Sequence, residues 1–256
     1  MTDKIKPLVV IAGQPDWAGQ ARQTLGDACT VVEYTSREGY VSRLVNDRPA
    51  LILVNGDTDD WPFWTATPRA SPATRRIPIL LISVDKDVQV KALLSGADLA
   101  FPPDVLADAR QLVADYGHVR SAEEIERLDC ECAERLPELA RQGVEKFNAG
   151  DYYRQHDLFE ALWMQTQGPV RDLYRAILQV GIAYFQITRG NYRGALKMLL
   201  RSVQWLAILP DVCQGVDVRR LREDSYRVRS ALESLPPEEI DRFDRSLLRP
   251  VRILDE

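Results

Sequence analysis

The chain has few cysteines and few histidines. Its four cysteines, spread over 256 residues, do not form the dense pattern of a disulfide-stabilised secreted domain. We therefore expect a reduced, cytoplasmic protein. The two histidines, His118 and His156, are too few for a usual zinc ligand set, and no two cysteines are spaced as Cys-x-x-Cys. We expect no metal and no other cofactor.

The chain also lacks long apolar runs and an excess of positive charge. No stretch approaches the roughly 20 apolar residues that span a bilayer, and the short apolar segment near the start is not a signal peptide. Acidic residues outnumber basic ones, 38 to 33, so neither a membrane nor a nucleic acid is an expected partner. One arginine group, interrupted by acidic residues, is interpreted as a solvated helix face: Arg219, Arg220, Arg222, Arg227 and Arg229.

Residues 1–117 alternate between short apolar runs and segments with helical spacing. Continuous apolar runs are typical of strands that are buried on both faces of a parallel sheet. Five such strands are expected, at residues 7–12, 29–34, 50–55, 77–83 and 99–101. Alternation of strand and helix predicts an α/β domain with a doubly wound, five-stranded parallel sheet of flavodoxin-like size.

Three segments of this half resemble the receiver domain of bacterial response regulators. They are PALILVN (49–55), IPILLIS (77–83) and GADLAFPP (96–103). The first corresponds to the strand that carries the phosphoacceptor aspartate of that family, the second to the strand that ends in Ser or Thr, and the third to the segment with its lysine. The resemblance implies a receiver-like fold over residues 5–117.

The residues that carry receiver chemistry are absent at the matching positions. The phosphoacceptor position is Asn55, and a neutral amide does not attack phosphorus. The acidic pair that holds Mg²⁺ falls on Ala12 and Gly13, or on Gly13 and Gln14, and the lysine falls near Pro102. Of the matching residues only Ser83 is kept. We therefore predict a pseudo-receiver that cannot take phosphate.

Two features of the loop after the third strand leave alternatives open. Asp57 could act as the acceptor in a shifted register, or it could be an ordinary turn residue like Asp59 and Asp60. Trp61, Phe63 and Trp64 could anchor a partner, or they could form a hydrophobic lid on the neighbouring helix.

The second half has helical spacing throughout. A connecting helix is expected in residues 118–136, where Ser121 and Glu124 form a capping box. An all-helical domain of helix hairpins is expected in residues 137–256. The segments FNAGDYYRQ (147–155) and ITRGNYRGA (187–195) repeat a Gly, Asx, Tyr turn at a period of 40, which predicts two stacked hairpins.

Residues 138–234 resemble a bacterial and plastid family, number 309 in the series of domains of unknown function. The likeness is carried by FNAGDYYRQHDLFEALW, the helix with AILQVGIA, ITRGNYRGALKMLLRSV, and Gly215-Val216-Asp217. The family pattern of His, then Glu, then Trp matches His156, Glu160 and Trp163, although Asp157 stands where many members have Glu. The resemblance implies a small all-α bundle and no particular activity.

His156 and Glu160 lie four residues apart and share a helix face with Tyr152 and Trp163. They could form a catalytic base with its orienting carboxylate. They could instead form a buried polar network with Tyr152 and a neighbouring arginine, while Asp157 points elsewhere. A third alternative is a ligand groove that also includes Tyr184.

Two functional hypotheses follow. The chain is a non-catalytic signalling or scaffold protein, whose helical domain binds an unidentified protein partner and which forms a homodimer through the receiver-like domain or the connecting helix. Alternatively, it is an enzyme or ligand-binding protein with its site at His156, Glu160 and Trp163.

Overall fold

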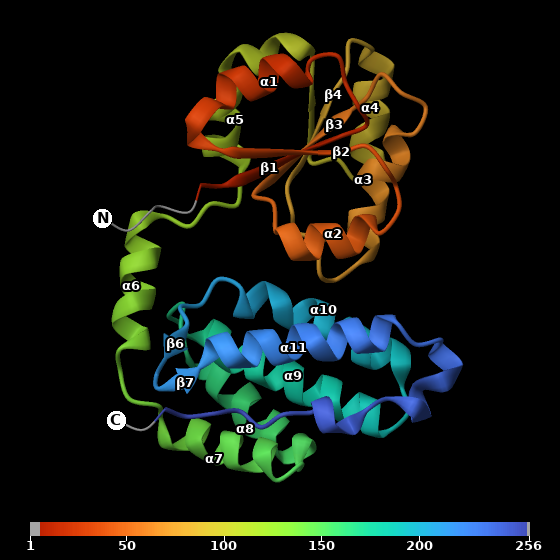
Figure 1. The fold of residues 1–256 in the computed structure, drawn as a ribbon. Helices are drawn as coiled ribbons and strands as arrows, with labels where there is room; N and C mark the ends of the chain where they lie inside the picture. Colours follow the sequence, from red (N-terminus) through yellow and green to blue (C-terminus); the bar gives the residue numbers. More distant parts are fainter. Residues whose placement is uncertain (1–5, 255–256) are drawn as a thin grey trace. The chain divides into compact units, whose positions relative to one another are not determined.

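The computed structural model describes residues 6–254. The chain divides into two compact units, residues 1–119 and 120–256, each with its own core (Figure 1). No helix among residues 6–254 is long and apolar enough to cross a membrane.

The N-terminal unit contains a five-stranded, fully parallel sheet with the strand order β2-β1-β3-β4-β5. The α/β layout expected from the sequence is therefore confirmed. The strands are β1 (Leu8–Ala12), β2 (Thr30–Tyr34), β3 (Leu51–Asn55), β4 (Ile79–Ile82) and β5 (Leu99–Phe101).

Helices cover both faces of this sheet. Alternate residues of the strands point to opposite faces, so Val9 and Ile11 belong to one apolar core while Val10 and Ala12 belong to another. The first core is closed by α1 (Ala18–Leu25) and α5 (Ala109–Tyr116). The second is closed by α2 (Tyr40–Asp47), α3 (Trp61–Ala70) and α4 (Lys86–Leu94). Short 3₁₀ turns at Gly26–Ala28 and Pro103–Asp108 precede β2 and α5.

Helix α3 contains the three aromatic residues that the sequence places in a loop. Pro62 lies in the first turn of this helix, where a missing N–H costs little. Trp64 is buried against Tyr40, with ring centroids 4.9 Å apart. Trp64 is therefore a core residue, as in the lid interpretation.

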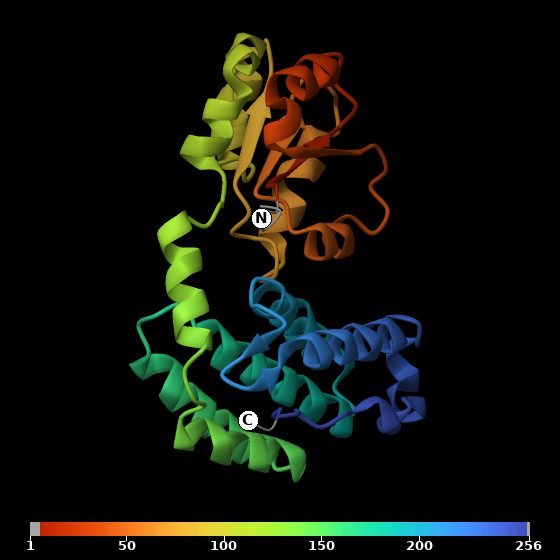
Figure 2. The same ribbon diagram turned by 60° about the vertical axis from the view of Figure 1, so that its left-hand side comes forward.

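The C-terminal unit is helical, and each helix from its second onward packs on the next one along the chain (Figure 2, green to blue). They are α6 (Ala122–Cys132), α7 (Glu138–Asn148), α8 (Tyr152–Gln165), α9 (Arg171–Thr188), α10 (Tyr192–Leu206) and α11 (Val218–Glu233). The capping box of Ser121 and Glu124 is confirmed at the start of α6. Short 3₁₀ turns follow at Pro237–Arg242 and Arg245–Leu247.

The repeated turn predicted at a period of 40 is confirmed. Gly150 and Gly190 both have positive φ, which ends the preceding helix without steric cost. Asp151 then accepts a hydrogen bond from the N–H of Arg154, and Asn191 accepts one from the N–H of Gly194. The α7–α8 and α9–α10 turns thus use the same chemistry.

Two glycines allow the central helices of this unit to approach closely. A Cβ atom at Gly143 of α7 would lie 2.6 Å from Cε2 of Phe159 on α8. A Cβ atom at Gly181 of α9 would lie 2.5 Å from Nε2 of Gln155 on α8. Helix α8 is thus held between its two neighbours by side chains that fill glycine-lined spaces.

The end of the chain is tied back to the helices. β6 (Val212–Cys213) and β7 (Val216–Asp217) form an antiparallel hairpin, and Ile253 bridges to Val216. Val251 exchanges two hydrogen bonds with the side chain of Asn148, at 2.8 and 2.9 Å.

A disulfide joins Cys132 at the end of α6 to Cys213 in β6. The expectation that the cysteines are all reduced is therefore wrong for this pair. The two residues are 81 positions apart, and only the folding of the hairpin against α6 brings them together; the N–H of Gln214 also donates to the carbonyl of Cys132 at 2.6 Å. Cys29 and Cys130 are free thiols.

The disulfide predicts a measurable contribution to stability. Because it closes a long loop, replacing both partners (Cys132→Ser with Cys213→Ser) should lower the free energy of unfolding by about 2–5 kcal/mol. The measurement is urea denaturation of the oxidised chain. Cys130→Ser, which removes an exposed free thiol, is the matched control and should leave the midpoint unchanged. Four titratable thiols in the denatured, unreduced protein would contradict the bond.

Candidate functional site

The carboxyl ends of β1, β3 and β4 meet at a crevice where the side chain of Asn55 is fixed by two hydrogen bonds. Its Nδ2 donates to the carbonyl oxygen of Gly13 at 2.9 Å, and its Oδ1 accepts from the N–H of Asp57 at 3.1 Å. Asn55 is only 5% exposed. The amide therefore joins the end of β1 to the loop after β3, and both its nitrogen and its oxygen are hydrogen-bonded.

Gly13 is required where Asn55 approaches it. Its φ is +92°, a conformation that favours glycine, and a Cβ atom there would lie 3.1 Å from Cβ of Asn55. The neighbouring Ala12 is fully buried. Neither Ala12 nor Gly13 brings a carboxylate into the crevice.

Asp57 is held by the strand beside it. Ser83 Oγ donates to Asp57 Oδ1 at 2.6 Å, and the N–H of Val84 donates to the same oxygen at 3.2 Å. Ser83 is fully buried and also accepts from the N–H of Asp85 at 3.0 Å. The structure thus brings Asn55, Asp57 and Ser83 together, and the hydroxyl that a receiver would offer to a phosphoryl group is bonded to a carboxylate.

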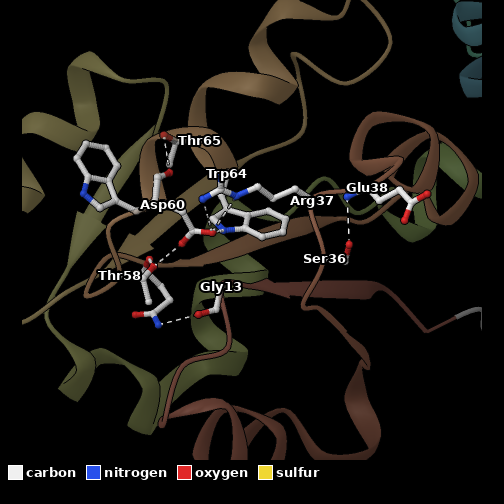
Figure 3. Close-up of polar contacts among 10 residues, drawn as sticks. Gly13, Ser36, Arg37, Glu38, Thr58, Asp60, Trp64 and Thr65 are labelled. Atoms are coloured by element: carbon white, nitrogen blue, oxygen red, sulfur yellow. Dashed lines mark hydrogen bonds and ion pairs between the residues drawn. The ribbon is translucent and has the colours of Figure 1, made fainter.

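Asp60 is the centre of a second set of hydrogen bonds (Figure 3). Its carboxylate accepts from Thr58 Oγ1 at 2.8 Å, from Trp64 Nε1 at 2.9 Å and from Arg37 Nε at 3.2 Å. Burial opposes its ionisation, but the bonds from Thr58, Trp64 and Arg37 and the charge of Arg37 lower the pKa of Asp60 below its ordinary value.

Asp60 therefore stays charged and fastens the loop after β2 to the start of α3. The guanidinium of Arg37 also lies 5.1 Å from the ring centroid of Phe63. No feature of the sequence alone pairs Arg37 with Asp60, because the two residues are 23 positions apart.

A shallow pocket of about 380 Å³ opens beside Asp57. It is lined by Gly56, Asp57, Thr58, Asp59, Trp61, Val84, Asp85 and Val88. Despite its aspartates, no group of three or more His, Cys, Asp or Glu residues in the described part of the chain is arranged to hold a metal ion. Pro102, the residue at the lysine position, follows β5 and is exposed.

The predicted residues of the helical unit do not form the expected network. His156 Nδ1 lies 3.3 Å from Asp157 Oδ1, so the expectation that Asp157 points elsewhere is wrong. The side chain of His156 is 30% exposed, and among residues 6–254 no hydrogen bond joins it to Glu160. Tyr152 instead packs edge-on against Phe147 and the fully buried Tyr184, so Tyr184 lines no open groove.

Trp163 contacts arginines of α9 rather than His156. Its ring centroid lies 5.4 Å from the guanidinium carbon of Arg171 and 4.9 Å from that of Arg175. Arg175 also lies 3.8 Å from the ring centroid of Trp205 on α10, and Trp205 Nε1 donates to Gln179. The sequence signal for this arrangement is the spacing of four between the two arginines, which places them on one face of α9.

The arginine group on α11 is only in part the solvated face that the sequence suggests: Arg219 and Arg227 are exposed, whereas the other three arginines are partly or fully buried. Asp224 is buried and pairs with Arg220 at 2.9 Å and with Arg227 at 3.0 Å. Arg222 donates to the carbonyls of Leu206 and Leu209, and Arg229 is 5% exposed. Arg220 and Arg227 thus neutralise Asp224 within α11, because a buried charge requires a partner, while Arg222 joins α11 to the end of α10 and the segment after it.

Comparison with known proteins finds a match to a sequence family and to an uncharacterized relative. Residues 140–198 match the family model of a domain of unknown function (DUF309). An uncharacterized protein of Aquifex aeolicus (strain VF5) is 25% identical over 89 residues, which are 34% of this chain and 27% of the relative. The chain thus spans about a quarter of the length of the curated relative it matches. The expected resemblance of the helical unit to this family is supported for residues 140–198.

Proposed function

We propose that the chain is a non-catalytic adaptor, in which a degenerate receiver-like domain serves as a rigid platform and the helical domain binds a protein partner. The observation that carries the proposal is the amide of Asn55, which stands at the end of β3 and is bonded at both ends, to Gly13 and to the N–H of Asp57. A receiver needs a free carboxylate at this point.

The sheet supports the receiver-like interpretation. Its strand order, 2-1-3-4-5, is one of the two common doubly wound orders, and ligands of such sheets bind at the carboxyl ends of the strands. Asn55, Asp57 and Ser83 lie there. The crevice is therefore in the right place for phosphoryl chemistry but holds the wrong groups for it.

Phosphoryl donors test this proposal. Incubation of the full chain with radiolabelled acetyl phosphate and Mg²⁺ should leave it unlabelled, because Asn55 cannot form an acyl phosphate and Asp57 is bonded to Ser83 and Val84. The readout is acid-stable, base-labile incorporation, followed by peptide mapping. Asp57→Asn is the control variant. A label on wild-type protein that this substitution abolishes would contradict the proposal.

The outer face of α4 supports a protein-binding role for this unit. Val90 and Leu94 are 65% and 89% exposed, and Val84, just before the helix, is 71% exposed. Leu93, which is also exposed, adjoins Val90 and Leu94 on the helix. A helix with apolar residues on both its inner and outer faces is typical of a helix that is covered on both sides. We propose that a second copy of the chain covers this face.

The α4 surface makes the oligomeric state testable. Val90→Asp with Leu94→Asp should convert a dimer into a monomer in sedimentation velocity, because two charges would be buried in the interface. Ile125→Asp tests the competing interface on α6, and Tyr153→Asp, at another exposed apolar side chain, is the control. A wild-type monomer at 100 μM (a concentration on the order of weak-dimer Kd values) would contradict the dimer.

A second function, an enzyme at His156, Glu160 and Trp163, draws less support. His156 bonds to Asp157 and Trp163 to arginines, so the three side chains do not converge on one reacting point as catalysis requires.

A further inference from the structure

Four side chains from three helices form a continuous aromatic and cationic cluster in the helical unit: Trp163, Arg171, Arg175 and Trp205, hereafter the Arg–Trp cluster. Arg175 contacts both indole rings, while Arg171 contacts Trp163 alone. Guanidinium groups within about 6 Å of a ring centroid are attracted by its π face. These contacts hold Arg171 and Arg175 against the indole rings.

Three arginines act on the carboxylate of Asp172 beside the cluster. Asp172 is the neighbouring carboxylate, and Arg120 Nη2 pairs with it at 2.9 Å. Burial raises the pKa of Asp172 above its ordinary value, although the charges of Arg120, Arg175 and Arg171 act to lower it. The Asp172 carboxylate is thus largely buried and faces several guanidinium groups.

Several hydrogen-bond donors in this region have no acceptor. Among residues 6–254, the guanidinium of Arg171 has no hydrogen bond or ion pair. Trp163 Nε1 and Arg120 Nη1 are buried and also lack a partner. Buried donors without acceptors are costly, and in native proteins such groups call for an explanation such as a bound ligand.

We infer that the Arg–Trp cluster binds an acidic segment of a partner protein, with a carboxylate of the partner paired to Arg171. Arginine presents a planar fork that matches a carboxylate in two parallel hydrogen bonds. The indole rings of Trp163 and Trp205 offer apolar surface for the residue beside that carboxylate. A nucleic acid fits less well, because binding of a phosphate backbone depends on many basic contacts, whereas the pairing proposed here uses the single guanidinium of Arg171.

This inference rests on the proposed adaptor function, because it gives the chemistry of the partner that the helical domain would bind. The probe is a fluorescein-labelled hexaglutamate peptide, titrated with the full chain at low ionic strength and read by fluorescence anisotropy. Labelled hexaglutamine reports binding through the dye or the backbone alone.

We expect saturable binding of hexaglutamate and none of hexaglutamine. Arg171→Gln should weaken binding at least tenfold, and Arg171→Lys should weaken it less, because the charge is kept while the planar fork is lost. Arg193→Gln is the matched control: Arg193 is an exposed arginine near the opposite end of α10 from Trp205, and its loss should change affinity less than twofold.

Three results would overturn the inference. The first is no saturable binding of hexaglutamate by the wild type. The second is an equal loss in Arg171→Gln and Arg193→Gln, which would show attraction to overall charge. The third is equal competition by free glutamate, inorganic phosphate or a thymidine oligonucleotide, which would assign the cluster to another ligand class.

The experiment also separates the two proposals. If the chain binds hexaglutamate but is also labelled by acetyl phosphate, the non-catalytic adaptor function is contradicted and the proposal of an acidic partner stands. A chain that acetyl phosphate does not label and that does not bind hexaglutamate would keep the non-catalytic adaptor and contradict the acidic partner.

Discussion

The side-chain amide of Asn55 is the interaction on which the N-terminal unit most depends. It links the end of β1 to the loop after β3 by donating to Gly13 and accepting from Asp57. An ionised carboxylate in the same place could accept but could not donate. Under the proposed function, the amide that links β1 to the loop after β3 is also the group that takes the place of a phosphoacceptor carboxylate, so one side chain accounts for both properties.

Under the proposed adaptor function, recognition rather than catalysis accounts for the features of the chain that have no partner. Asp57 and Asp60 are both engaged in fixed hydrogen bonds and hold loops in place. Among residues 6–254, the features without partners include the apolar outer side of α4 and the donors of Arg171 and Trp163. Exposed apolar patches and unpaired hydrogen-bond donors are typical of surfaces that bind a partner.

Features set by neighbouring residues could be predicted from the sequence, whereas those set by distant contacts could not. Apolar runs located the strands, and the turns at Gly150 and Gly190 were recognisable because each uses a glycine followed by a capping residue. Helix α3 was not predicted, since its aromatic residues were expected in a loop; Pro62 lies in the first turn of the helix, where a missing N–H costs little. The disulfide and the stacking of Arg175 on Trp205 depend on tertiary packing, which no local pattern contains.

The most direct measurement of the central claim is the pH dependence of stability in Asn55→Asp. A buried carboxylate facing the Gly13 carbonyl has a raised pKa, so its protonated form, which can donate, is favoured in the folded state. At pH 7 the variant should be less stable than the wild type by about 1–3 kcal/mol in urea denaturation, and the difference should shrink as the pH falls toward about 4. Equal stability at pH 7, with the same pH profile as the wild type, would contradict the account.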